Sequence, residues 1–258
     1  MVQATDRFMA DALSVLIFDS IEELGAAAAE NTATIVRDAI GANGSARVIF
    51  ATGNSQFDFV DALRAKAGID WSKVTAFHMD EYVGMDANHP ASFRKWIRER
   101  IENELHPSAV HYLEGDAPSA EEECQRFESL LREAPIDLIC MGIGENGHIA
   151  LNDPPVADFN DPVWVKVVEL DAACRLQQVG EGHFPTFDDV PTHALTLTIP
   201  ALIAPERIQV VAPESRKAQA VHDALEGPIK TTCPASILRQ QRNAVLFLDG
   251  DSASLLSR

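Results

Sequence analysis

The residues best suited to chemistry follow a glycine-rich segment in the second half of the chain. A short apolar run ends in Gly142, Gly144 and Gly147, and His148 and Asp153 follow within six residues of the last glycine. A histidine gains or loses a proton near neutral pH, and a neighbouring carboxylate can orient it. The spacing predicts an acid–base pair, which is favoured over a purely structural histidine.

The same glycines fit the dinucleotide-binding pattern G-x-G-x-x-G, which is a weak signal on its own. Asn152, Pro154 and Pro155 forbid a long helix directly after it. Without that helix, a pyrophosphate has no helix dipole to bind. We therefore expect a tight left-handed turn and close approach of a ligand, and no nicotinamide or flavin cofactor.

A second candidate site follows the apolar run 73–79, where Asp80 and Glu81 are adjacent. Carboxylates at the end of a buried strand are costly unless they are solvated, paired or used. One of them could take a proton from a carbon next to a carbonyl. The alternatives are a surface turn, or a metal pair of His78 with Asp80. No third ligand stands at a convincing spacing, so no metal site is expected.

Two further segments could bind an anion. Backbone N–H groups of the turn Thr52-Gly53-Asn54-Ser55 could do so at a helix start, although Ser55 could equally be an ordinary N-cap. Arg216 and Lys217 follow Ser215 in a predicted first helical turn, where cations oppose the helix dipole. A nearby anion explains them better than helix stability does, and a solvated surface pair is the alternative.

Apolar runs alternate with amphipathic segments along most of the chain. Strands are predicted over 13–18, 47–51, 73–79, 111–113, 136–141, 164–170, 207–212 and 243–249, and helices over 21–40, 56–67, 92–104, 119–133 and 214–225. Residues 171–193 are expected to be an irregular loop, and 194–199 fit a helix or a strand. The pattern predicts an α/β fold, a mostly parallel, Rossmann-like sheet with helices on both faces. We expect one domain over residues 1–258, with 1–12 as an N-terminal extension for which a helix is one option.

Composition narrows the range of partners. The 258 residues are 46% hydrophobic and carry a formal net charge of −18, which argues against nucleic acid and anionic membranes. An anionic substrate would need a local basic site. The cysteines at 124, 140, 174 and 233 show no zinc spacing, and Cys140 is expected to be a buried free thiol. No signal peptide or membrane-spanning stretch is recognisable, so a cytoplasmic protein with a small-molecule substrate is expected.

From about residue 13 to residue 250, the sequence resembles the glucosamine-6-phosphate deaminase/isomerase family. The specific similarity lies in 77–84 with His89-Pro90, and in 142–154. Weaker support comes from 52–55, and from 215–217 followed by Glu226-Gly227. The resemblance implies conversion of a 2-amino-2-deoxy hexose 6-phosphate, glucosamine 6-phosphate first, to a ketose 6-phosphate and ammonia. It implies no metal and no organic cofactor, and it is compatible with a homo-oligomer.

The resemblance also implies roles for individual residues. Asp80 would move a proton from C2 to C1 of the opened sugar phosphate. His148 would open the ring, assisted by Asn146 and oriented by Asp153. The substrate would be bound by Thr52, Gly53, Asn54, Ser55, Glu81, Gly144 and Lys217.

Two departures from the family pattern stand out. Asp153 occupies a position where family members usually carry Glu, so its reach to His148 is one methylene shorter. The arginine that well-known deaminases place near the phosphate is missing near Gly180. Arg175 or His183 is expected to compensate, which leaves the identity of the amino sugar open.

Two rival functions remain. The related 6-phosphogluconolactonases share the fold and a glycine-rich motif that ends in histidine. They lack the sequence found here at 80–84, and they continue differently after the histidine. A non-catalytic sugar-phosphate sensor is the other rival. The presence of both Asp80 and His148 argues against it.

Overall fold

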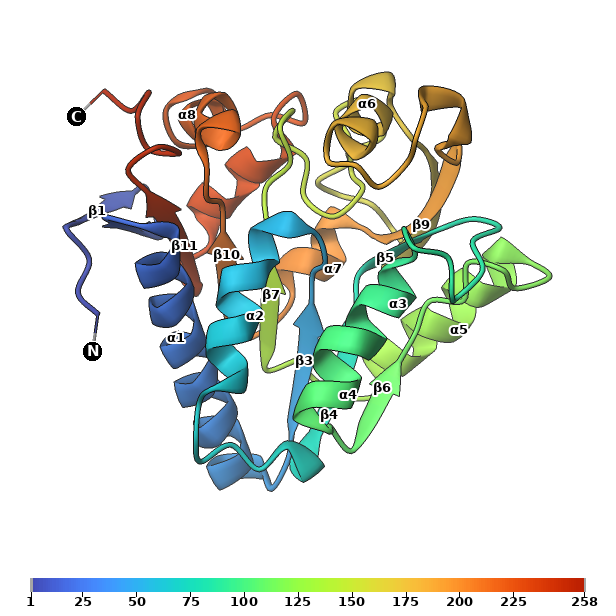
Figure 1. Cartoon of the computed structure of the whole chain (residues 1–258), viewed down its shortest axis with the longest axis horizontal. Helices are drawn as coiled ribbons and strands as arrows, with labels where there is room; N and C mark the ends of the chain where they lie inside the picture. Colours follow the sequence, from blue (N-terminus) through green and yellow to red (C-terminus); the bar gives the residue numbers. More distant parts are fainter. Residues whose placement is uncertain (1, 258) are drawn as a thin grey trace.

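An eight-stranded sheet forms the centre of the computed structural model, which describes residues 2–257 (Figure 1). Its strands, in spatial order, are β1 (Asp6–Ala10), β2 (Leu13–Phe18), β11 (Ala244–Asp249), β10 (Ile208–Val211), β7 (Leu138–Met141), β3 (Ala46–Phe50), β4 (Val74–His78) and β6 (Ala109–His111). All neighbours pair in parallel except β1 with β2.

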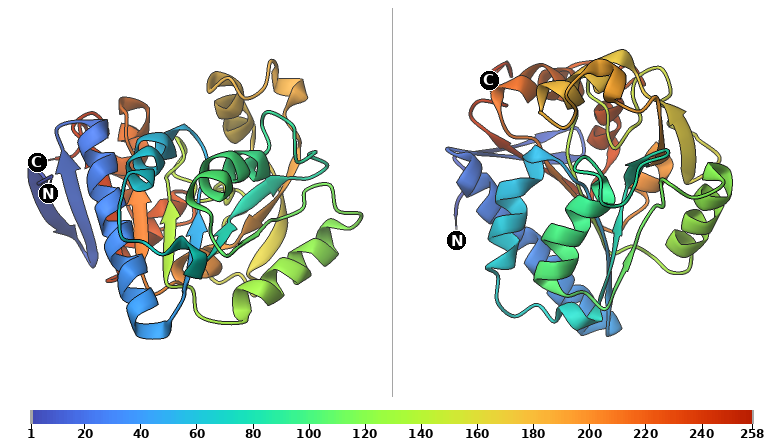
Figure 2. Two further views of the ribbon diagram at one scale, coloured as in Figure 1. Left: turned by 60° about the horizontal axis from the view of Figure 1, so that its bottom comes forward. Right: turned by 45° about the vertical axis from the view of Figure 1, so that its right-hand side comes forward.

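Helices cover both faces of this sheet, as the two views of Figure 2 show. One face carries α1 (Ile21–Asn43), α2 (Phe57–Arg64) and α3 (Phe93–Ile97), and the other carries α5 (Ala120–Arg132), α7 (Ile199–Ile203) and α8 (Ala218–Glu226). The alternation of side chains along each strand explains the two layers. In β3, Val48 and Phe50 enter one core cluster and Ile49 enters the other. The predicted α/β class is confirmed.

Helix α1 shows how local sequence sets the bounds of an element. The Ser20 hydroxyl accepts a hydrogen bond from the Glu23 N–H at 3.2 Å and so caps the N-terminus of the helix. The helix ends before Gly44, which adopts φ 81°. Elsewhere, α3 continues through a π-helical turn (Arg98–Glu102) into the short α4 (Asn103–Leu105).

The order of the strands creates a crevice. From β3 the chain proceeds outward to β4 and β6, and then returns to β7, β10 and β11 on the other side of β3. In open α/β sheets, ligands bind outside the carboxyl ends of the strands where the order reverses in this way. Here that place is the end of β3 and β7.

A second, antiparallel sheet begins where β4 ends. It consists of β5 (Asp80–Tyr82), β9 (His193–Leu197) and β8 (Val165–Glu169). The chain leaves the large sheet at Met79, whose carbonyl accepts from the Leu197 N–H at 2.8 Å, and Asp80 pairs with Thr196. The chain thus changes sheets within two residues of the predicted carboxylate pair.

Three sequence predictions need correction. Residues 6–10 form strand β1, paired antiparallel with β2, and not a helical extension. Within the predicted loop 171–193, α6 (Ala172–Gly180) is helical and residues 187–189 form a 3-10 turn. The short strand expected at 111–113 lies two residues earlier, as β6. The ambiguous segment 194–199 falls largely within strand β9.

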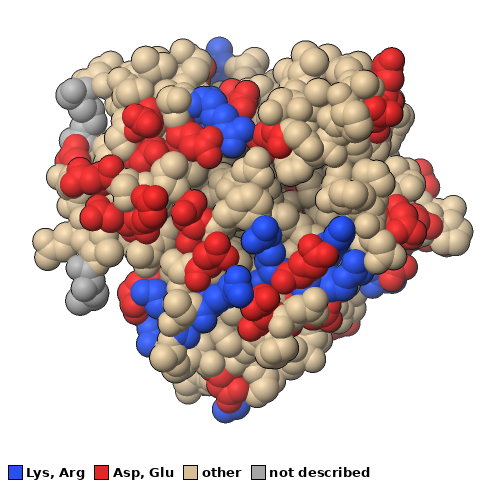
Figure 3. All heavy atoms as spheres, in the orientation of Figure 1, with Lys and Arg blue, Asp and Glu red and all other residues tan. Residues whose placement is uncertain are grey.

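The surface shows the acidity of the chain. In Figure 3, acidic side chains are spread over the visible face, and basic ones gather in a band across its lower half. Within residues 2–257, no helix is both long and apolar enough to cross a membrane.

Gly115 tests the packing at the start of the second sheet. A Cβ at this position would collide with the Tyr82 carbonyl oxygen and lie 2.8 Å from Glu81 Cγ. Gly115→Ala should therefore lower the free energy of unfolding by about 1–3 kcal/mol, the usual cost of overpacking. The change is measured by urea denaturation.

Gly41→Ala is the matched control. Gly41 lies inside α1 with no atom within 4 Å of an added Cβ. This substitution should stabilise the protein by about 0.5–1 kcal/mol, because alanine favours a helix over glycine. Equal effects of the two substitutions would contradict the assignment of Gly115 as a point of close packing.

Candidate active site

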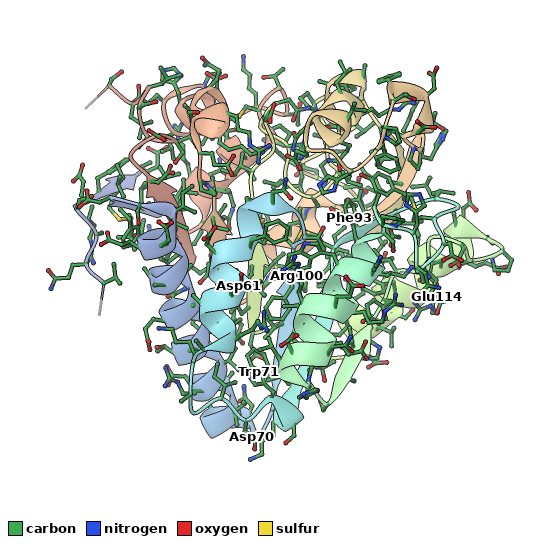
Figure 4. All side chains as sticks on the ribbon, viewed as in Figure 1. Asp61, Asp70, Trp71, Phe93, Arg100 and Glu114 are labelled. Atoms are coloured by element: carbon green, nitrogen blue, oxygen red, sulfur yellow. The ribbon has the colours of Figure 1, made fainter. Side chains whose placement is uncertain are left out.

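A cavity of about 90 Å³ lies over the carboxyl ends of β10, β7, β3 and β4. Its wall comprises Ala51–Ser55, Met79, Asp80, Phe93, Gly142–Gly144, His148, Ala150, Leu151, Gln177, Gln178, Glu181, His183, Arg216 and Lys217. Helix α3 contributes Phe93 to this wall, and Figure 4 labels this residue at the upper end of the helix.

Asp80 borders the cavity as the first residue of β5. Burial, together with the charge of the adjacent Glu81, raises the pKa of Asp80 to about 8. Within residues 2–257, no hydrogen bond to its carboxylate is formed. A carboxylate whose pKa lies near the pH of the medium, and which has no hydrogen-bond partner in the protein, is suited to take and return a proton.

Glu81 faces away from the cavity, because successive residues of a strand point to opposite sides. Its carboxylate is fully buried and accepts hydrogen bonds from the Tyr82 N–H at 2.9 Å, the Ser92 hydroxyl at 2.7 Å and the Arg94 N–H at 3.0 Å. The Phe93 N–H also donates a hydrogen bond to this carboxylate, at 3.3 Å. Glu81 therefore joins β5 to the start of α3 and lies outside the cavity wall, where its predicted role in substrate binding would have placed it.

The predicted acid–base group is assembled by the turn after β7. Asp153 Oδ1 lies 2.9 Å from His148 Nδ1 and accepts from Asn146 Nδ2 at 2.9 Å. Asn146 Oδ1 accepts from the His148 backbone N–H at 3.0 Å. Asp153 is fully buried, and burial acts to raise its pKa, but His148 and Asn146 together lower it below its usual value. The carboxylate is therefore an anion that orients the histidine.

The contact between His148 Nδ1 and Asp153 is close without being a well-aligned hydrogen bond. The two atoms are 2.9 Å apart, yet the ring nitrogen has no acceptor in line with it. The pairing is therefore mainly electrostatic in this conformation.

Two glycines make room for this arrangement. A Cβ on Gly144 would collide with the His148 ring, so only glycine allows the imidazole to lie across the turn. Gly147 adopts φ 82°, the left-handed conformation predicted for this motif. No helix follows directly, as the prolines predicted, and residues 149 and 152 form an isolated bridge.

The basic side of the cavity comes from the turn after β10. Lys217 is almost fully buried and, within the described chain, forms no ion pair. Burial lowers the pKa of Lys217, and Glu181 counteracts this effect. An isolated buried cation is costly, so an anion in the cavity would stabilise it.

Arg216 and Glu181 form an ion pair beside that lysine. Arg216 Nη1 lies 3.1 Å from Glu181 Oε1, and His183 Nε2 lies 3.3 Å from Glu181 Oε2. Burial acts to raise the pKa of Glu181, but hydrogen bonds with His183 and Gln177 and the neighbouring cations lower it. Glu181 is therefore an internal anion among the groups that could hold a phosphate.

The turn Thr52–Ser55 lies on the cavity wall, ahead of α2. Ser55 is not the N-cap of that helix. The N-cap is Gln56, without a capping side-chain bond, and its side chain donates to Ser55 Oγ at 3.0 Å. The capping alternative is thus wrong, and the turn is part of the cavity wall.

Arg175 does not reach the cavity. Its guanidinium donates to the carbonyls of Phe187 at 2.8 Å and Val190 at 2.9 Å, and it lies over the Phe187 ring. The expectation that it replaces the missing arginine is therefore corrected: Arg175 holds the segment after α6 together. His183 borders the cavity as predicted.

The sequence motifs did not identify several residues of the cavity wall, namely Phe93, Gln177, Gln178 and Glu181. Arg216 is recognisable in the sequence as a cation at a helix start, although the motifs assign only its neighbour Lys217 to the substrate. The four others carry no motif: Phe93 is on α3, Gln177 and Gln178 are on α6, and Glu181 directly follows α6.

Comparison with known proteins agrees with this geometry. Residues 19–154 match the family model described as glucosamine-6-phosphate isomerases/6-phosphogluconolactonase. A glucosamine-6-phosphate deaminase of Bacillus cereus is 33% identical over 245 residues, which cover 95% of this chain and 90% of that protein.

Solved structures show the same fold. A monomeric glucosamine-6-phosphate deaminase superposes with a TM-score of 0.85 at 29% identity, covering 94% of this chain and 99% of that chain. A 6-phosphogluconolactonase from Shewanella baltica superposes with a TM-score of 0.76 at 20% identity, covering 91% of this chain and 97% of that chain. The chain therefore belongs to the glucosamine-6-phosphate isomerase/6-phosphogluconolactonase family and is an enzyme of the deaminase/isomerase type.

Proposed function

We propose that the protein converts glucosamine 6-phosphate to a ketose 6-phosphate and ammonia without a metal ion. The observation that carries the proposal is that a single cavity is bordered by Asp80 and by His148, whose ring lies 2.9 Å from the buried Asp153 carboxylate. Aldose–ketose isomerisation needs a base at C2 and a group that opens the ring. The names of the relatives support the amino sugar as substrate.

In the proposed mechanism, His148 first opens the pyranose ring by moving a proton from the C1 hydroxyl to the ring oxygen. Asp80, as the carboxylate, then takes the proton from C2 and returns it to C1. Asp153 and Asn146 keep the imidazole in place during both steps. Ammonia leaves from C2 of the resulting imine when water adds.

The phosphate would lie between Lys217, Arg216 and the Thr52–Ser55 turn. Lys217 is buried and without an ion pair in the described chain, and Arg216 is paired with Glu181. Arg216 would thus supply the guanidinium that the family pattern places elsewhere. A cytoplasmic location and a homo-oligomer stay predictions.

The reaction class is tested by measuring ammonia release from glucosamine 6-phosphate beside hydrolysis of 6-phosphogluconolactone. Ammonia release is expected. Lactone hydrolysis without ammonia would move the protein to the rival activity, and binding without turnover would favour a sensor.

His148→Gln should lower the turnover of the cyclic sugar more than the turnover of an analogue that cannot cyclise, because only the cyclic sugar needs ring opening. Equal losses of turnover on both substrates would assign His148 to a later step.

Asp80→Asn keeps the shape of the side chain and removes the base, so turnover should fall by roughly 100-fold or more. In the unsubstituted enzyme, kcat/KM should rise as the pH increases through about 8, because Asp80 acts only when deprotonated. The residual activity of the variant should lack this rise. A pH profile that is the same in both proteins would exclude Asp80 as the base.

Asp80→Asn should also change stability in a defined pH window. The folded-state pKa of about 8 lies above the ordinary 3.8, so unfolding releases a proton between these values. The Asp80 contribution to stability therefore falls as the pH rises from about 4 to about 8. The free energy of unfolding of the variant should exceed that of the unsubstituted protein by at least about 1 kcal/mol at pH 8. This difference should shrink toward pH 4.

Lys217→Met and Arg216→Met should each raise the half-saturation concentration of the phosphorylated sugar roughly tenfold to hundredfold, the loss of one charged hydrogen bond. Use of the unphosphorylated sugar should hardly change. Glu181→Gln should act in the opposite direction, because it removes the anion that competes with the phosphate.

Arg175→Met is the matched control for these cation substitutions. Its side chain is bound to backbone carbonyls outside the cavity, so any loss should affect phosphorylated and unphosphorylated sugar alike. If Lys217→Met and Arg216→Met also fail to discriminate between the two sugars, the phosphate binds elsewhere.

A further inference from the structure

Three side chains with metal-ligand atoms meet behind the cavity. His148 Nδ1, a carboxylate oxygen of Asp153 and Cys174 Sγ all lie within 4.8 Å of one another. Each residue is less than one-tenth exposed. They come from the turn after β7 and from the first turn of α6.

One atom of this cluster, His148 Nδ1, lacks a hydrogen-bond partner, whereas the Asp153 carboxylate accepts from Asn146 Nδ2 at 2.9 Å and from the Asp171 N–H. His148 Nδ1 is buried and has no aligned hydrogen-bond acceptor, although Asp153 Oδ1 is 2.9 Å away. Asp153 Oδ2 accepts from the Asp171 N–H at 3.3 Å, a long bond. Burial raises the pKa of the Cys174 thiol, so without a metal it carries its proton.

Cysteine, histidine and aspartate together form a ligand set typical of zinc. Zn–N and Zn–O bonds of about 2.0–2.1 Å and a Zn–S bond of about 2.3 Å put the ligand atoms of a tetrahedral site roughly 3.3–3.7 Å apart. The distances here run from 2.9 Å between His148 and Asp153 to at most 4.8 Å. Shifts of a few tenths of an ångström to about one ångström would suffice, with the fourth position open.

We propose that His148, Asp153 and Cys174 bind a zinc ion that inhibits the enzyme. The inhibition rests on the proposed function of His148, whereas the binding does not. On binding, the thiol releases its proton to solvent, and the imidazole coordinates through Nδ1 as the neutral Nε2–H tautomer. The ion thereby removes His148 and Asp153 from ring opening.

The ion would enter through the substrate cavity. His148 borders that cavity, and Gln177 and Gln178, on the helix that carries Cys174, line its wall. Zinc and the sugar phosphate would therefore compete for access. Magnesium, which avoids thiolate ligands, should not bind at this site.

Inhibition is tested by titrating the enzyme with Zn²⁺, and in parallel with Mg²⁺, while ammonia release is followed. Each protein is compared with its own metal-free rate. Zn²⁺ should inhibit and a chelator should restore the rate. Cys174→Ser should raise the inhibitory concentration roughly tenfold or more, because a hydroxyl is a poor zinc ligand. Cys124→Ser, a buried thiol on α5, is the matched control and should behave like the unsubstituted enzyme.

Binding is tested without any reference to turnover by titration with Cd²⁺, whose bond to a thiolate gives an ultraviolet charge-transfer band. The unsubstituted protein and Cys124→Ser should both show the band. Cys174→Ser should lose it, and His148→Gln should weaken binding while keeping the thiol. A band that persists in Cys174→Ser, or no band in the unsubstituted protein, would overturn the site. Cadmium binding through Cys174 in a protein that releases no ammonia would retain the site and refute the proposed function.

Discussion

The geometry of the cavity depends on the buried carboxylate of Glu81, which holds β5 against α3. It accepts hydrogen bonds from its own strand and from the N-terminal turn of α3, and Arg94 Nε lies 3.4 Å away. Burial of such an anion is tolerated only because these donors surround it. The bonds hold β5 against α3, and so Asp80, one residue earlier, is presented to the cavity.

The electrostatics of the site differ from those of the whole molecule. A chain with a net charge of −18 repels a sugar phosphate at long range. At the cavity, Lys217 and Arg216 supply local positive charge, and Glu181 and Glu214 pair with Arg216. An incoming anion would therefore meet one buried cation without an ion pair, Lys217, and one cation that is already paired, Arg216.

Much of the fold follows from the sequence, because strands buried on both faces appear as continuous apolar runs. The ends of β3, β7 and β10 were therefore located within a residue or two, and with them His148 and Lys217. Helix α6 is not predicted, because Gly180 at its end, Gly182 just after it and its polar side chains are equally typical of a loop. Residues near a motif were misassigned where orientation mattered. Asp80 and Glu81 are neighbours in sequence and face opposite ways, a difference that depends on which strands pair. Arg175 was misassigned because its contacts at 187 and 190 are made only in the folded chain.

Helix α6 connects two parts of the site that differ in chemistry. Its N-cap residue, Asp171, donates its backbone N–H to Asp153, and its later residues, Gln177 and Gln178, form cavity wall. The same rigid element thus restricts the motion of the histidine's partner and contacts the space a substrate fills. A single helix thereby links the wall of the cavity to the buried partner of His148 through one continuous backbone.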